Sequence, residues 1–395
     1  MKATTLRLLG LLTILGIFIV PKSAASNALS LQGDATPSAS QASEQCQAKG
    51  PIRQIALSAD SRYLLTPWDK TSARLWDFKT GQVLHTFSPP QDNDVSDEQT
   101  YVVDVSFSPD GNYALLGKYD GVATLWNVKS GEKVRTFGEP GSIGEHQIQF
   151  SPDGKYILAS YGDGAVLWDV QSGNKIRSFL QPLDLDYTNE FSSDSKFVLT
   201  GTTLWDVQTG QALHSFDGWA AKISPGGNYV STLSGAGLQI WNAHTYKLMA
   251  TLDTEYVPVA GVFSPDEKYI LTYPNQTTVG LYNLQTGQQQ IIFTFSGKLH
   301  YGIFLRDKPY LIVLEGQAQT TVHTWDLATN KEIGSVTLDV PLFYLPGNYL
   351  IVPNGDTIIT ASIADPNNLK TDTPLDADLI QLWDTKTGQL LRSFC

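Results

Sequence analysis

A seven-residue element recurs along the chain and constrains the fold more than any other feature. Each copy places an apolar residue before a polar turn and usually closes on an aromatic residue, as in FSPDGKY at 150–156. The copies begin at residues 57, 107, 150, 191, 223, 263, 304 and 351. Starts about 40 residues apart are typical of β-propeller blades, whereas common helical repeats are about 33 residues long.

A second element follows each copy and contains an apolar or Thr residue, an aromatic residue, and Asp or Asn. The aromatic residue is Trp in every copy except the sixth, which has Tyr282. A Gly-containing turn usually comes next and leads to a fourth strand that often ends in Phe, as in RTF at 135–137. Turn residues between short apolar runs predict four strands per unit. The expected fold is all-β, a single eight-bladed propeller.

The fourth unit leaves an alternative of seven blades. Only eight residues separate Phe197 from Trp205, fewer than in the other units. The missing residues fall between the second and third strands, so a tight turn at 200–203 would keep all four strands. This interpretation favours eight blades.

The succession of FSPDG and LWD resembles the WD-repeat β-propeller family over residues 52–394. The family's Gly-His pair before each first strand is represented only by the loose sequence 144–146. We therefore expect packing between the repeated aromatic residues to hold the blades together. Basic residues stand two positions before the terminal Phe of five fourth strands, where we expect them to protect sheet edges: His85, Arg135, Arg177, His214 and Arg392.

The N-terminus has the pattern of a signal peptide. Lys2 and Arg7 precede an apolar run at 8–20, and small residues follow it. A retained membrane anchor is the alternative, but the run is short for a membrane span. We predict a signal peptide at 1–25, a Ser/Ala/Gln-rich linker at 26–50 and a propeller at 51–395. The mature chain would have no integral membrane segment and would be periplasmic or extracellular.

The charge balance bears on the partner. The net charge is -12, and such an acidic chain is a poor candidate for nucleic acid. Acidic residues are frequent in the segments expected to join successive blades. We therefore expect a monomer that acts as a scaffold for a protein or peptide, and the acidity of these segments favours a basic partner. The candidate partner-binding residues are Trp68, Tyr161, Asp184, Asp186, Tyr187 and Trp219.

The sequence contains no known hydrolase, metalloprotease, nucleotide-binding or haem motif. We therefore expect no catalytic residue, cofactor or metal. One alternative is a propeller enzyme whose site at the channel mouth combines His146 and His300 with Asp184 and Asp186. A cation-binding propeller is another, because residues 92–98 and 184–186 supply clustered oxygen ligands for calcium.

The chain has two cysteines, Cys46 and Cys395. Cys395 follows the last strand, and Cys46 stands where the connection into the first blade would begin. Both map to the junction between the last and first blades, and exported proteins are generally oxidised. We predict a Cys46–Cys395 disulfide that closes the ring.

Overall fold

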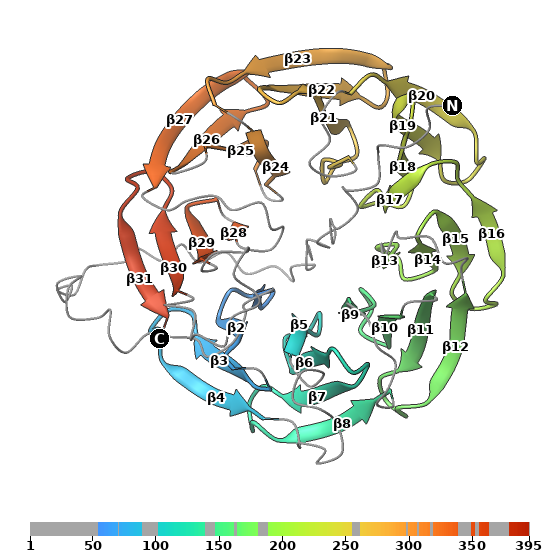
Figure 1. The fold of residues 1–395 in the computed structure, drawn as a ribbon, viewed down its shortest axis with the longest axis vertical. Helices are drawn as coiled ribbons and strands as arrows, with labels where there is room; N and C mark the ends of the chain where they lie inside the picture. The colour runs from blue at the N-terminus through green and yellow to red at the C-terminus, as the bar shows by residue number, and fades with distance from the viewer. Residues whose placement is uncertain are drawn as a thin grey trace, which may run out of the picture.

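The computed structural model shows a ring of eight antiparallel sheets around a central axis (Figure 1). It describes residues 54–69, 71–88, 102–138, 147–161, 164–180, 189–254, 261–297, 299–305, 308–316, 319–338, 349–351, 355–362 and 379–394. Every regular element in these ranges is a β-strand. The prediction of an all-β, eight-bladed propeller is confirmed. The described part of the chain has no helix with the length and apolar character needed to span a membrane.

The first four blades are four-stranded meanders. Blade 1 contains β1 (Ala56–Leu57), β2 (Tyr63–Pro67), β3 (Ala73–Asp77) and β4 (Val83–Phe87). Blade 2 contains β5 (Val102–Phe107), β6 (Tyr113–Lys118), β7 (Ala123–Asn127) and β8 (Lys133–Phe137). Blade 3 contains β9 (Ile148–Phe150), β10 (Tyr156–Tyr161), β11 (Gly164–Asp169) and β12 (Lys175–Leu180). Blade 4 contains β13 (Asn189–Phe191), β14 (Phe197–Thr200), β15 (Thr203–Asp206) and β16 (Ala212–Ser215).

The other four blades complete the ring. Blade 5 contains β17 (Trp219–Ile223), β18 (Tyr229–Ser234), β19 (Gly237–Asn242) and β20 (Leu248–Leu252). Blade 6 contains β21 (Tyr269–Asn275), β22 (Thr278–Asn283) and β23 (Gln288–Thr294), with an inner bridge between Phe263 and Ile270. Blade 7 contains β24 (Leu299–Phe304), β25 (Tyr310–Gly316), β26 (Thr320–Asp326) and β27 (Lys331–Leu338). Blade 8 contains β28 (Tyr349–Ile351), β29 (Thr357–Ser362), β30 (Leu379–Asp384) and β31 (Leu390–Phe394).

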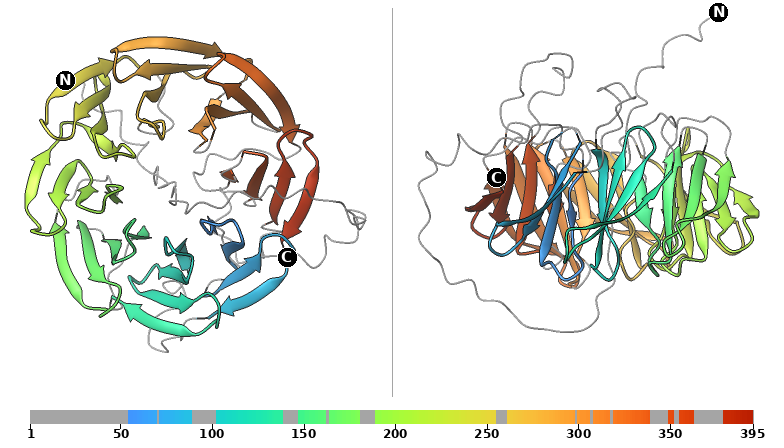
Figure 2. Two further views of the ribbon diagram at one scale, coloured as in Figure 1. Left: turned by 180° about the vertical axis from the view of Figure 1, so that it is seen from behind. Right: turned by 90° about the horizontal axis from the view of Figure 1, so that it is seen from below.

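The meander gives the ring two different faces, seen edge-on in Figure 2. The strand ends that lead into the connections between second and third strands and between successive blades lie on one face, which we call the loop face. Turns between first and second strands and between third and fourth strands lie on the other, the turn face. The recurring seven-residue element forms the first of these turns.

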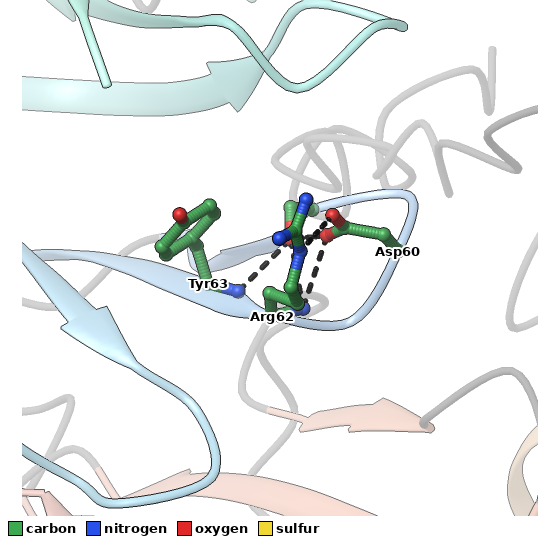
Figure 3. A network of polar contacts seen from close by, with 4 residues as sticks. Asp60, Arg62 and Tyr63 are labelled. Carbon is green, nitrogen blue, oxygen red and sulfur yellow. Dashed lines mark hydrogen bonds and ion pairs between the residues drawn. The ribbon is translucent and has the colours of Figure 1, made fainter. Parts of the chain in front are cut away.

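In blade 1 that turn is stabilised by its own side chains (Figure 3). The Ser58 hydroxyl donates to Asp60 at 2.7 Å and accepts from the Tyr63 amide at 2.9 Å. Arg62 donates to the same carboxylate. Partial burial acts to raise the pKa of Asp60, but the hydrogen bonds from Arg62 and Ser58 outweigh it and lower that pKa. The recurring Ser and Asp therefore fix the turn.

Aromatic residues hold neighbouring blades together, as expected. Phe87 ends β4, and its ring centroid lies 5.2 Å from that of Trp126 in the next blade. Phe137–Trp168, Phe179–Trp205, Phe216–Trp241 and Phe293–Trp325 repeat the contact at 6.3, 5.6, 5.7 and 3.9 Å. At the ring closure, Phe394 of blade 8 packs against Trp76 of blade 1 at 5.8 Å.

The basic residues of the fourth strands do more than the edge protection expected of them, because they reach the next blade. Arg135 donates from Nη1 to the Ser172 carbonyl and from Nη2 to the Gln171 carbonyl, both at 2.8 Å. Arg177 donates to the Gln208 carbonyl at 2.7 Å in the same way. Each arginine therefore hydrogen-bonds to the turn between the third and fourth strands of the following blade.

Candidate interaction face

Blade 4 is the shortest blade and lowers the rim of the loop face. Strands β14 and β15 pair over four residues and end at the Thr200–Thr203 pair, whereas β10 and β11 in blade 3 continue to Tyr161–Gly164. The predicted tight turn at 200–203 is therefore confirmed. Two fewer residue pairs at about 3.3 Å each place the end of this hairpin roughly 7 Å lower than its neighbour.

Two exposed apolar side chains flank the short blade. Leu180, the last residue of β12, is 64% exposed, and Trp219, the first residue of β17, is 52% exposed. No other large apolar side chain in the described ranges is as exposed as these two. Thr203 and Ser215, on the strands between them, share a hydrogen bond at 2.9 Å. Apolar anchors beside hydroxyl groups are suited to binding another chain.

A β-bulge presents Trp219. The pairing of β17 with β18 shifts register between Trp219 and Lys222. Gly218 and Ala220, on either side of the tryptophan, have φ values of 109° and 52°. A side chain at Gly218 would collide with the Leu233 carbonyl, so the bulge requires glycine there. A positive φ at alanine costs on the order of 1 kcal/mol, and such strain is frequent at functional sites.

An ion pair fixes the base of this bulge. The Lys222 ammonium donates to Glu190 of the neighbouring inner strand, β13. The other oxygen of the Glu190 carboxylate accepts from the Ile223 amide at 3.2 Å. The two charged side chains are only 11% and 18% exposed, so solvent screens the pair weakly. Blades 4 and 5 are thereby joined directly beneath Trp219.

The structure places Trp68 differently from Trp219. The Arg74 guanidinium lies 3.2 Å from the centroid of the Trp68 ring, and Trp76 contacts that ring edge-on at 6.4 Å. Trp68 is half-buried and packs against the hydrophobic cluster that joins blades 8 and 1. Most of this aromatic surface therefore serves packing within the ring.

Several other predicted residues fall outside what the structure describes. Tyr161 ends β10, but its side chain is not described. The other predicted residues that lie outside the described part of the chain are Asp184, Asp186 and Tyr187, the alternative catalytic residue His146, the side chain of His300, the calcium candidates at 92–98, Cys46 and Cys395.

Leu180 was not among the candidate residues from the sequence. The available signal was an apolar residue directly after a strand-ending Phe, at the start of a connection between blades. Within the described residues, no group of three or more His, Cys, Asp or Glu side chains is arranged to hold a metal ion.

Eight blades, seven with four strands and one with three strands and an inner bridge, define a β-propeller. Together with the repeated Trp-Asp elements and the aromatic packing between blades, they make it a propeller of the WD-repeat type. Residues 81–224 match the sequence model of the family described as Eukaryotic translation initiation factor eIF2A, a family of WD-repeat-like propellers. The matched segment runs from the turn before β4 to the residue directly after β17, so the similarity covers only part of the ring. No curated protein matches the chain.

Proposed function

We propose that this protein is an exported, non-enzymatic scaffold that binds a protein or peptide through the loop face above blade 4. The observation that carries the proposal is Trp219, which a strained bulge holds half-exposed beside a shortened blade. An isolated tryptophan exposed at an arbitrary surface position would not need a glycine and a positive-φ alanine around it. Leu180 supplies a second anchor on the opposite side of blade 4.

Charge favours a basic partner. Asp217 precedes the bulge and is exposed on a chain with a net charge of -12. A negative surface accelerates association with a basic partner more than it strengthens the final complex. The apolar anchors would supply most of the affinity.

Partner capture followed by titration with the purified partner tests this proposal. Trp219→Ala is expected to weaken binding at least roughly 30-fold, as for an interface residue worth about 2 kcal/mol. Ile333→Ala is the matched control, since Ile333 is 51% exposed on the outer strand β27. Equal binding by the wild type and Trp219→Ala would exclude this face, and N-terminal sequencing of the purified mature protein tests export.

A further inference from the structure

The interface between blades 5 and 6 has smaller side chains than its counterparts. Elsewhere the third-strand aromatic residue is Trp, and it usually packs against a Phe of the preceding blade. Here the two positions hold Tyr282 and Leu252, which share one hydrophobic cluster. Two residues before Tyr282 the chain has Gly280, where blades 5 and 7 have Gln239 and His323. Three reductions in side-chain volume therefore coincide at one interface.

A cavity of about 350 Å³ lies at this interface. Thr251 and Asp253 line it from blade 5, and Thr272, Tyr282 and Gln289 line it from blade 6. Its volume falls within the range of small-molecule sites, about 300 to 1,000 Å³. Thr251 and Asp253 are exposed, so the cavity is open to solvent.

One buried hydroxyl group in the cavity has lost the partner that its counterparts keep. In blades 1, 4, 5 and 8 the third-strand indole N–H donates to a second-strand threonine, in the pairs Trp76–Thr66, Trp205–Thr200, Trp241–Thr232 and Trp383–Thr360, at 2.8, 2.8, 2.9 and 2.9 Å. Thr272 stands at the same strand position in blade 6, but Tyr282 has no indole N–H. Thr272 is 4% exposed, and its Oγ1 has no hydrogen-bond partner among the described residues.

Gly280 leaves room for the Gln289 amide beside this hydroxyl group. A Cβ atom at Gly280 would collide with the Gln289 amide and with Thr272 Oγ1. The glycine thus allows an amide and a hydroxyl group to approach the same stretch of β22. Buried polar groups in native proteins are normally hydrogen-bonded, so an unpaired one that lines an open cavity indicates a ligand.

The chemistry of the lining defines the ligand class. The polar groups are hydroxyls, an amide and one carboxylate, and Tyr282 adds an aromatic surface. None of the described residues that line the cavity is basic, so an anion would lack a counter-charge from them. The one carboxylate among the described lining residues is too few for a calcium ion, which takes about six to eight oxygen ligands. We propose that the cavity binds a neutral, polyhydroxylated molecule the size of a monosaccharide.

Isothermal titration of the full-length protein with D-glucose, D-galactose and N-acetyl-D-glucosamine tests this proposal. We expect saturable binding of at least one sugar, about tenfold weaker in Thr272→Val because one hydrogen bond is lost. Gly280→Gln, which restores the residue type of blade 5, should abolish binding by filling the cavity. Thr360→Val is the matched control for Thr272→Val, because Thr360 stands at the same strand position in blade 8 and does not line the cavity.

Absence of saturable sugar binding would overturn the proposal, and so would binding that Gly280→Gln leaves unchanged. A parallel titration with choline distinguishes a cation site, and binding of choline in place of the sugars would also overturn it. Thermal melting shows whether each variant is folded. If Gly280→Gln does not fold, Thr272→Val still tests the proposal, because valine has nearly the same shape as threonine. Sugar binding and partner capture by Trp219 depend on different residues, so either can fail alone.

Discussion

At the scale of single residues, Asp104 is the group whose charge is least compatible with its surroundings. It lies on the inner strand β5, is 2% exposed, and accepts a hydrogen bond from the Ile148 amide of blade 3 at 2.7 Å. Its second carboxylate oxygen has no partner among the described residues. Burial raises the pKa of Asp104 to about 7, and the hydrogen bond from the Ile148 amide offsets only part of this effect.

This pKa predicts how stability depends on pH. A folded chain that keeps a proton on Asp104 loses it on unfolding, so the free energy of unfolding should fall as pH rises from about 4 to about 7. Asp104→Asn retains an acceptor for the Ile148 amide and carries no charge. We expect the variant to be more stable than the wild type by on the order of 1–3 kcal/mol at pH 8 and similar to it near pH 4.

Urea unfolding monitored by tryptophan fluorescence at both pH values measures this difference. Asp217→Asn, at an exposed site, is the control for general charge effects. A stability difference that does not change with pH would show that Asp104 is ionised in the folded protein.

At the scale of elements, the turns between third and fourth strands and the basic residues that contact them from the preceding blade depend on one another. Gly173 has a φ of 77°, and a side chain there would collide with Arg135. Gly131 and His85 are related in the same way one blade earlier. In blade 5 the glycine is replaced by Tyr246, which keeps a positive φ of 60° and stacks on His214 at 4.7 Å. In blades 2 and 3 the glycine therefore suits both the positive φ of the turn and the close approach of the basic residue, whereas blade 5 accommodates a tyrosine that stacks on the histidine.

Arg135→Ala tests how much one such contact contributes to stability. The variant loses two hydrogen bonds to carbonyl groups and the packing of its side chain on Gly173, so we expect a destabilisation of about 1–2 kcal/mol. Hydrogen exchange should accelerate in the turn at 171–173. Lys133→Ala, an exposed position on the same strand, is the control. Unchanged exchange in that turn would mean that the arginine contributes nothing to the contact between blades 2 and 3.

The repeated elements could be predicted from the sequence because each one carries its own signals. The Ser, Asp and aromatic residues of each turn recur in register, and so do the Trp-Asp pairs. Trp219 could be identified because it falls outside that register. Its bulge could not be predicted, since the positive φ of Ala220 has no compositional signal. The cavity could not be predicted either, because it arises only when the reductions at Leu252, Gly280 and Tyr282 face one another across two blades.

At the scale of the whole molecule, the strands that the structure describes close the ring without exchange between the first and last blades. Blade 8 consists of β28 to β31 and blade 1 of β1 to β4, so no strand of one pairs in the sheet of the other. Contacts between side chains close the ring, with Phe394 against Trp76 and stacked on Phe78 at 6.0 Å. Every other pair of neighbouring blades is also joined by the chain itself. The junction between blades 8 and 1 lacks this covalent connection, so it depends most on additional stabilisation.

The predicted Cys46–Cys395 disulfide would supply that link. Cys395 directly follows Phe394, which already packs against blade 1. Closing a loop of this size stabilises the fold by roughly 5–6 kcal/mol in the chain-entropy model, and strain reduces the gain. Thiol titration of the unfolded protein should detect no free thiol before reduction and both cysteines after it. Cys395→Ser should lower the melting temperature as much as reduction does, and reduction should have no further effect on that variant. Equal thiol counts with and without reductant would show that side-chain contacts alone close the ring.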